Sequence, residues 1–437
     1  MSKIPVLDGM ELEKARATRI PGWGGGTPLI LVRGSGASVW DSTGKEYIDC
    51  TSQAWSLNLG YDHPRVLEAA MAQMQQLGHA RSSFDTFPHL MLSKRLAELT
   101  PGDSGKQVSY CLHGSLAVET AMKQALRQNN QGAFISLYDG YHGRSFGSLA
   151  LSWPHPNNAF LGFQGRVVRV PQAYCYRCSF GLAYPSCGLQ CVKFTEEAVE
   201  KAVDGRPIAF IMEPVQGNGG MVEFPAEYYT AIRELCTRHE ILLIWDEIQT
   251  GFGRVGAMTA AELYGVVPDI VIFGKGIGGG FPLAGTIARD DLEPLAPGDH
   301  GFTFGTFPIS MAAALATLDV LEEENLLERC RTLGQQITER LRELKDQYEM
   351  IGDVRGPGLM IGFELVKDRQ TKEPACQEAN QFIREGMKRG VMYGGTKYLG
   401  LGNIVKIKPP LVIEESQVEE VLEVTEEILD QLSAARA

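Results

Sequence analysis

The residue best suited to chemistry is Lys275, which follows the apolar run Ile270–Phe273 within a glycine-rich stretch. Burial at the end of a strand makes the charged form of a lysine costly. The same desolvation lowers the pKa of the amine and makes it a nucleophile toward carbonyl carbons, which is the chemistry of a Schiff base. The flanking glycines, Gly274 and Gly276, let another group approach the backbone closely. For an isolated Gly-Lys-Gly sequence, a solvated surface lysine is the alternative.

A carboxylate at the end of a second apolar run gives Lys275 a partner. Asp246 follows Ile241–Trp245 and precedes Lys275 by 29 residues. This separation is close to one strand–helix–strand crossover of roughly 30 residues. Both side chains would then lie at the carboxyl ends of parallel strands, where open α/β sheets place their ligand sites.

The elements that must position these residues alternate along the chain. Strands are expected at 108–112, 133–137, 207–212, 241–245 and 269–273, with amphipathic helices between them, for example at 226–239. Such alternation predicts an α/β fold with a mainly parallel sheet. We predict a large domain over residues 64–310.

The two ends of the chain have a different character. Short strands and turns occupy residues 29–50. A long helical stretch is expected from 311 to about 348, followed by strands near 360–366 and 405–407 and a C-terminal helix. We therefore predict that a smaller α+β domain is built from both ends of the chain, residues 1–63 and 311–437.

Composition excludes several classes of function. The 437 residues are 44% apolar and 22% charged, which is typical of an ordinary globular protein. No apolar run reaches the ~18 residues of a membrane span, and the N-terminus lacks the apolar core of a signal peptide. A net charge of −12 disfavours nucleic acids and acidic membranes as partners. Nine cysteines, an odd number, suit a reducing compartment, so we expect a cytoplasmic protein.

Lys275 and Asp246 together suit an enzyme that uses pyridoxal phosphate. The lysine would hold the aldehyde, and the carboxylate would keep the pyridine nitrogen protonated so that the ring accepts electrons. In sequence and spacing, Trp245–Arg254, Gly274–Gly276 and Gly279–Leu283 resemble motifs of the class III aminotransferases, a fold-type I pyridoxal-phosphate family. The resemblance extends along nearly the whole chain.

The resemblance assigns cofactor contacts to further residues. His113-Gly114-Ser115 resembles the turn that cradles the phosphate at a helix N-terminus, although Ser115 alone would be read as a helix cap. Tyr141 would cover one face of the pyridine ring and Ile248 the other, whereas a structural tyrosine is the alternative for Tyr141. Gln249 would bond the ring hydroxyl oxygen. The expected set is completed by His142, Glu213 and Thr303.

The segment His300–Gly305 resembles one that crosses to a second subunit. There Thr303 and the N–H of Phe302 would complete the phosphate site, so the resemblance implies an obligatory homodimer with shared active sites. A glycine- and aromatic-rich loop is the alternative. Trp55 falls where relatives place a residue lining the way in for substrate, with a core tryptophan as the alternative.

Two positions depart from the family pattern where substrate is selected. Many members carry an arginine three residues before the Pro409-Pro410 pair, and here Lys406 takes its place. A lysine keeps the charge but loses the planar fork that grips a carboxylate. Asn218 replaces a glutamate that pairs with that arginine in many ω-amino-acid members. We therefore expect Lys406 to be available to a substrate carboxylate, with Arg81 or Lys397 as alternative cations.

Four cysteines lie within 17 residues, as Cys175-x2-Cys178 followed by Cys187-x3-Cys191. In a cytoplasmic enzyme this spacing predicts a metal knuckle, most simply a tetrahedral structural zinc. Four reduced thiols in a surface loop, or one or two disulfides, are the alternatives.

These observations predict a transaminase that moves an amino group from an amine or amino acid to an α-keto acid by a ping-pong course, with Lys275 as general acid and base. A decarboxylase or an amino-acid racemase of the same fold is the alternative. The intact Lys275, Asp246 and Gln249 disfavour a non-catalytic homologue. A nucleotide-binding protein using Gly278–Gly280 is disfavoured because that stretch is not G-x-G-x-x-G.

Overall fold

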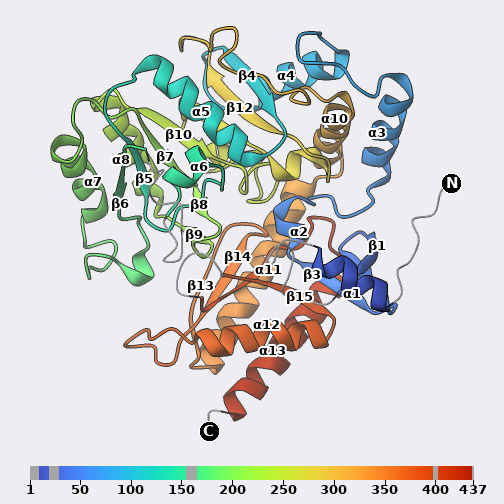
Figure 1. Cartoon of the computed structure of the whole chain (residues 1–437). Coiled ribbons are helices and arrows are strands. Elements are labelled where there is room, and N and C mark those ends of the chain that lie inside the picture. Colours follow the sequence, from blue (N-terminus) through green and yellow to red (C-terminus); the bar gives the residue numbers. More distant parts are fainter. Residues whose placement is uncertain (1–8, 19–28, 154–164, 397–401, 436–437) are drawn as a thin grey trace.

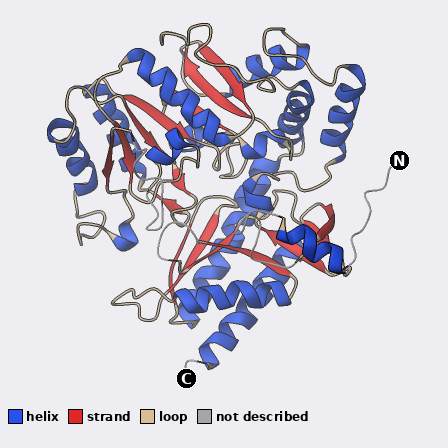
Figure 2. Ribbon diagram, viewed as in Figure 1, coloured by secondary structure: helices blue, strands red, loops and turns tan. Residues whose placement is uncertain are grey.

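The computed structural model describes residues 9–18, 29–153, 165–396 and 402–435 (Figure 1). These residues build two seven-stranded sheets and one two-stranded ribbon. The two large sheets lie in the upper and lower parts of the view, and helices flank each of them (Figure 2).

The upper sheet is the α/β sheet expected from the alternating pattern, with strand order β4-β12-β11-β10-β7-β5-β6. Its strands are β4 (Lys106–Cys111), β5 (Phe134–Leu137), β6 (Val167–Val170), β7 (Ala209–Met212), β10 (Leu242–Asp246), β11 (Ile270–Phe273) and β12 (Ala284–Arg289). β10 pairs in parallel with β7 and β11, and β5 pairs in parallel with β6 and β7. Only β12, which the sequence pattern did not suggest, runs antiparallel to its neighbours β11 and β4.

Helices cover both faces of the upper sheet because successive strand residues point to opposite sides. Phe210 and Leu243 pack into one core with α7 (Gln190–Lys201) and α8 (Ala226–Arg238). Their strand neighbours, such as Ile211 and Ile244, pack into another core with α5 (Gly114–Gln128). Apolar residues at every strand position are what a parallel sheet buried on both faces requires.

The lower sheet joins the two ends of the chain, with strand order β1-β2-β3-β15-β16-β14-β13. Its strands are β1 (Leu31–Ser35), β2 (Ser38–Asp41), β3 (Glu46–Cys50), β13 (Ile351–Arg355), β14 (Ile361–Leu365), β15 (Val391–Gly395) and β16 (Ile404–Ile407). β3 and β15 pair in parallel, which brings N-terminal and C-terminal segments side by side. The helices α11 (Leu326–Gln347), α12 (Cys376–Lys388) and α13 (Glu415–Ala434) pack together beside this sheet (Figure 1). The boundaries at residues 63/64 and 310/311 stay a prediction.

The long helical stretch expected from residue 311 to 348 is in fact two helices. α10 (Pro308–Glu323) ends before Asn325, whose φ of +52° lies in the left-handed region, and α11 follows it. Asparagine tolerates this conformation better than most residues. α10 packs against α3 (Pro64–Gln76) and α4 (Phe87–Leu99). Apolar periodicity continues on both sides of the break, so it did not reveal the break.

The remaining described elements are short: α1 (Gly9–Ala17), α2 (Ser52–Trp55), α6 (Phe146–Leu151), η2 (Cys175–Arg177), β8 (Val215–Gln216), β9 (Val222–Glu223), α9 (Ala260–Tyr264) and η3 (Lys275–Gly278). Within the described ranges, no helix is both long and apolar enough to cross a bilayer.

Candidate active site

Lys275 lies just beyond β11, where Gly274 leads the chain into the short helix η3. Its φ of +51° lies in the left-handed region, a conformation that non-glycine residues seldom adopt and that recurs at functional sites. Burial lowers the pKa of Lys275 to about 8, against the opposing negative charges of Asp246 and Glu213. The amine is therefore closer to neutrality at physiological pH than a surface lysine.

Asp246 is the last residue of β10, the strand next to β11. One carboxylate oxygen, Oδ2, lies 2.8 Å from His142 Nδ1, and the other, Oδ1, accepts the backbone N–H of Ile248 at 3.2 Å. Both Asp246 and His142 are buried. The buried carboxylate is thus held in one orientation at the strand end.

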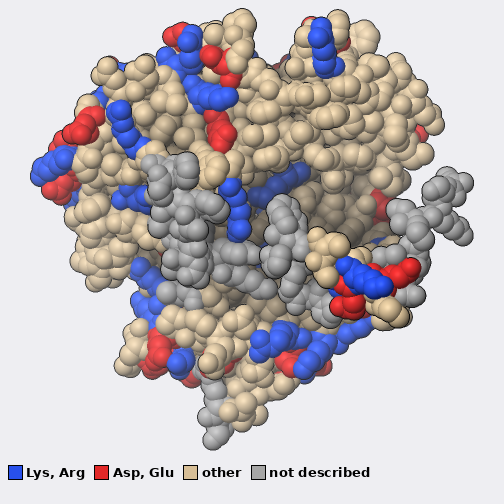
Figure 3. Space-filling view, in the orientation of Figure 1, with Lys and Arg blue, Asp and Glu red and all other residues tan. Residues whose placement is uncertain are grey.

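These residues face a single cavity of about 440 Å³. Eight of the residues expected to contact cofactor line it: Gly114, Ser115, Tyr141, His142, Asp246, Ile248, Gln249 and Lys275. On the face of the molecule drawn in Figure 3, lysine and arginine side chains gather in the hollow at its centre. The cavity has the size of a small-molecule site.

The donors and acceptors around this cavity fit pyridoxal phosphate. The N-cap of α5, His113, makes no side-chain cap, so the N–H groups at this helix start are free of a capping side chain and can receive a phosphate. A Cβ on Gly114 would lie 2.8 Å from Ile248 Cδ1, so any side chain there would require Ile248 to shift. Gln249 Oε1 is buried without a hydrogen-bond partner, as expected of a group that awaits a ligand. Asp246 supplies the anion that a pyridinium nitrogen needs.

Glu213 and Thr303 do not line the cavity of this single chain. Glu213 lies behind it, where its carboxylate accepts the backbone N–H groups of Tyr141 at 2.8 Å and Gly217 at 3.1 Å. Burial raises the pKa of Glu213 to about 7. Thr303 is exposed on its loop. Glu213 therefore orients the Tyr141 segment, and the assignment of Thr303 depends on a second subunit.

Trp55 stands at the edge of the cavity, on the turn whose neighbours Ala54 and Ser56 line it. All four residues of α2 (Ser52–Trp55) have positive φ, between +43° and +69°. This left-handed backbone costs a non-glycine residue about 1–2 kcal/mol. Asp49 holds the turn by accepting the N–H groups of Thr51 at 2.7 Å and Gln53 at 3.2 Å.

Three lysines surround the Trp55 ring. The ammonium of Lys408 lies 3.1 Å from a ring centroid, that of Lys275 lies 5.5 Å away, and that of Lys406 lies 5.6 Å away. Lys406 is fully buried and donates to the Gly217 carbonyl at 2.8 Å. Burial lowers its pKa to about 7. Lys406 therefore lies behind Trp55 rather than in the cavity wall. Of the alternative cations, Lys397 falls outside the described residues.

Sequence reasoning did not assign a role to Arg254 or Asn58. The Arg254 guanidinium is fully buried and donates to the carbonyls of Leu359 at 3.0 Å and Pro409 at 2.6 Å and to Asn58 Oδ1 at 2.9 Å. A Cβ on Gly276 would lie 2.3 Å from Asn58 Nδ2, so Asn58 also packs directly under the Lys275 loop. The signal available in the sequence was that Arg254 is the last residue of the Trp245–Arg254 motif.

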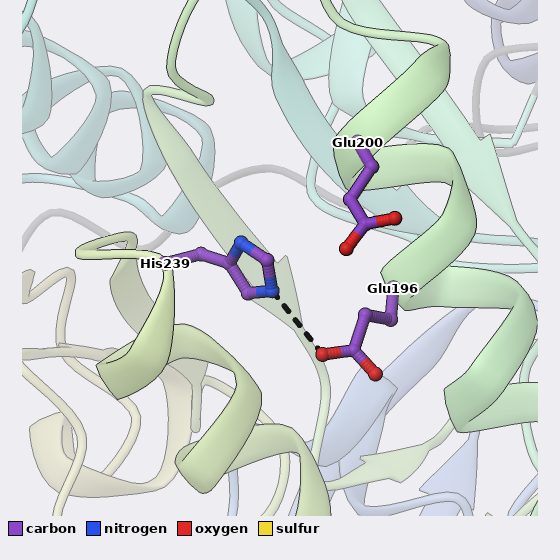
Figure 4. Close-up of side chains that lie close together, drawn as sticks. All are labelled: Glu196, Glu200 and His239. Atoms are coloured by element: carbon purple, nitrogen blue, oxygen red, sulfur yellow. Dashed lines mark hydrogen bonds and ion pairs between the residues drawn. The ribbon is translucent and has the colours of Figure 1, made fainter.

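The four clustered cysteines line one small cavity on the outside of the upper sheet. No three of their sulfur atoms come within 4.8 Å of one another, since among the described residues only Glu196, Glu200 and His239 form a group that tight. Figure 4 shows this group, in which Glu196 accepts from His239 Nε2 at 3.2 Å. Glu196 is also paired with Arg238 at 2.6 Å. We read this group as a surface ion-pair cluster.

The fold and the cavity define a class of enzyme. An open α/β sheet that places a lysine and an aspartate at adjacent strand ends, beside a helix N-terminus, has the architecture of the fold-type I pyridoxal-phosphate enzymes. The profile of the aminotransferase class-III family matches residues 22–429. The chain belongs to this family and is a pyridoxal-phosphate-dependent aminotransferase, which confirms the predicted family, fold class and enzyme class.

Known proteins resemble the chain over nearly its full length. A leucine/methionine racemase of Thermococcus litoralis is 35% identical over 94% of this chain and 92% of that protein. The 5-aminovalerate aminotransferase DavT of Pseudomonas aeruginosa is 34% identical over 97% of this chain and 98% of that protein. The crystal structure of a transaminase from the marine bacterium Virgibacillus superposes with a TM-score of 0.87 at 30% identity, over 98% of this chain and 99% of that chain.

Proposed function

We propose that this enzyme takes an amino group from an amine or amino acid and gives it to an α-keto acid. Lys275 would take the proton from the substrate carbon that bears the amino group and would pass it on. The observation that carries the proposal is that Lys275 and Asp246 project from adjacent parallel strands into one cavity. Bound pyridoxal phosphate supplies the electron sink. Turnover assays that pair a panel of amines with α-keto acids test the proposal directly.

Each residue around the cavity has a distinct task in this proposal. Asp246, held by His142, stabilises a positive charge on the pyridine nitrogen. The start of α5 at Gly114 and Ser115 receives the phosphate, and the Ser115 hydroxyl also accepts the N–H of Arg144 at 3.1 Å. Lys275, whose pKa is lowered to about 8, takes up and returns a proton near neutral pH.

An amino-acid racemase is the second candidate, because the leucine/methionine racemase is similar over most of both chains. Racemisation needs the proton to return to the other face of the same carbon, whereas transfer needs it to move to the cofactor. Incubating one enantiomer of an amino acid without keto acid separates the two. Formation of the opposite enantiomer over many turnovers would identify a racemase, and a single turnover that stops would identify an aminotransferase.

A homodimer is part of the proposal, and an exposed apolar surface supports it. Large apolar side chains project into solvent from α3 and α4, among them Met71, Met74 and Phe87, which is 81% exposed. Phe304, beside Thr303, is also exposed and lies 4.9 Å, ring to ring, from His79 just after α3. Such a surface marks a protein interface. A second copy seated there would bring its own Thr303 loop to the interface.

Mixing inactive variants tests the shared site. We expect Lys275→Ala and Thr303→Ala homodimers each to have reduced activity, and their mixture to regain some, because one hybrid site has both residues intact. A monomer by light scattering at working concentration would contradict the homodimer. We also propose that the enzyme is cytoplasmic, because its nine cysteines are an odd number and five of them are scattered singly, and cell fractionation would test this.

A further inference from the structure

The four cysteines of residues 175–191 lie around one enclosed space that the aminotransferase chemistry does not use. Cys175, Cys178, Cys187 and Cys191 all line a cavity of about 20 Å³, which has room for about one water-sized body. Cys175 is exposed and the other three are partly exposed, so an ion can reach the thiols from solvent.

The backbone presents these cysteines in two tight turns. Cys175 begins the short helix η2 and Cys178 follows it, with the Gly181 N–H donating to the Cys178 carbonyl at 3.0 Å. Cys187 precedes a left-handed turn at Gly188 and Leu189, whose φ values are +55° and +52°. Cys191 lies in the first turn of α7. Paired cysteines two or three residues apart on tight turns are the usual frame of structural zinc sites.

The four sulfur atoms must come closer together before they can share one ion. No three of them lie within 4.8 Å in the described structure, whereas four ligands at about 2.3 Å from zinc would lie closer together than this. Side-chain rotation can supply the difference in a partly exposed turn.

The same turn is anchored in the lower sheet. Tyr174 and Arg177, on either side of Cys175, both bond the carboxylate of Glu364 on β14. Glu364 is fully buried, and Arg355 Nη1 also donates to it at 3.1 Å. Asn403 Nδ2 donates to it as well, at 3.2 Å. Because Glu364 has four hydrogen-bonding partners, its burial is compensated.

Further contacts, beside those with Glu364, also hold the cysteine turn against the lower sheet. Lys372 Nζ donates to the Tyr176 carbonyl at 2.6 Å and lies 4.7 Å from the centre of the Tyr176 ring. A Cβ on Gly352 of β13 would lie 2.3 Å from the Tyr176 hydroxyl, so the tyrosine packs directly on that strand. The cysteine turn of the upper domain is therefore fixed to β13 and β14 of the lower sheet.

We propose that Cys175, Cys178, Cys187 and Cys191 bind one zinc ion per chain, and that the zinc-bound turn is a clamp that fixes the upper domain to the lower sheet through Glu364. On binding, four thiols release four protons and four sulfur–zinc bonds form, without any change of oxidation state. Soft thiolate ligands in a tetrahedral set favour zinc over magnesium or calcium.

Metal analysis tests the site itself. We expect about one zinc per chain in wild-type protein purified without added metal, and at least a tenfold loss in Cys178→Ser and Cys191→Ser. Cys376→Ser, which alters a partly exposed cysteine outside the cavity, should keep the zinc. Zinc near zero with four titratable thiols, a disulfide in the peptide map, or iron in place of zinc would each overturn the proposal.

Hydrogen exchange of the wild-type enzyme tests the clamp, and this experiment does not depend on any variant folding. Removing zinc with a chelator should speed amide exchange several-fold both in residues 174–191 and in β13 and β14. Glu364→Gln should speed exchange in the same two regions while the zinc content stays near one. Faster exchange confined to residues 174–191, with β13 and β14 unchanged, would overturn the clamp.

Discussion

His142 Nδ1 lies 2.8 Å from Asp246 Oδ2, with both side chains buried at the floor of the cavity. The imidazole fixes the orientation of the carboxylate. We expect His142→Ala to leave Asp246 a buried acceptor without this partner, which costs about 1–3 kcal/mol. By the relation of 1.36 kcal/mol per tenfold, kcat/KM should fall by about 5- to 150-fold. Steady-state kinetics checks this, with His239→Ala, at the Glu196 ion pair, as the surface control.

Substitution of Asp246 should reduce activity far more than substitution of its partner His142. Asp246→Asn removes the charge that keeps the pyridine nitrogen protonated, so kcat should fall by several orders of magnitude. Single-turnover rates with saturating amine measure this. Glu247→Gln is the matched contrast, because Glu247 is an adjacent buried carboxylate that accepts the N–H groups of Ala260 at 2.6 Å and Ala261 at 2.8 Å. Glu247→Gln should lower Tm with a much smaller effect on kcat.

A small effect at Asp246 would change the interpretation. If Asp246→Asn stays within about threefold of wild type, less than ~0.7 kcal/mol in activation free energy, its role is only structural.

Lys406 is expected to bind the carboxylate of the keto acid, which requires that the Trp55 ring move aside to open the cavity to Lys406 and that the carboxylate displace the Gly217 carbonyl. Only the charged amine binds an anion, and its pKa in the folded protein is about 7. The KM of the keto acid should therefore be lowest below pH 7 and rise as pH increases through 7. Lys406→Ala should raise this KM sharply and remove its pH dependence near 7. Equal losses for keto acids and for amines without a carboxylate would leave Lys406 a structural residue.

Trp55 should control the size of the amine that enters. Its ring stands beside the lining residues Ala54 and Ser56, and the Lys408 ammonium lies against it. Trp55→Ala should accelerate turnover of bulky amines relative to small ones, because loss of a large side chain at the edge of the cavity would enlarge the space open to the amine. The ratio of kcat/KM for a bulky and a small amine measures this. An unchanged ratio would mean that Trp55 has only a structural role in the core and does not select the amine.

The sequence was most informative where a local pattern determines position. Apolar runs ending in Asp246 and Lys275 predicted two parallel strand ends, and β10 and β11 do pair in parallel, with Asp246 opposite Ile272. Such strand ends can be predicted because a buried strand is a continuous apolar run and because one strand–helix–strand crossover has a characteristic length. The family resemblance added Gly114, Tyr141, Ile248 and Gln249, all of which line the cavity.

Other features depend on contacts between distant segments and had no local signal. Four consecutive non-glycine residues in the left-handed turn of α2 show no turn signature. Asp49 holds the turn locally, and Ser52 Oγ donates to the carbonyl of the distant Lys408. In the sequence nothing distinguishes Lys408 from a surface lysine. Its position directly after β16 brings it against Trp55. The antiparallel β12 was missed because Ala284–Arg289 contains only one large apolar residue, Ile287.

The central claim is that Lys275 holds the cofactor and carries the proton, and the visible spectrum of the purified enzyme tests it most directly. Wild-type enzyme should show the absorbance of lysine-linked pyridoxal phosphate, lose it when an amine donor is added, and regain it with an α-keto acid. Lys275→Ala, with an unchanged circular dichroism spectrum, should lack that absorbance and show no turnover, whereas the surface variant Lys201→Ala, on α7, should behave as wild type. Undiminished transamination by Lys275→Ala would contradict the account.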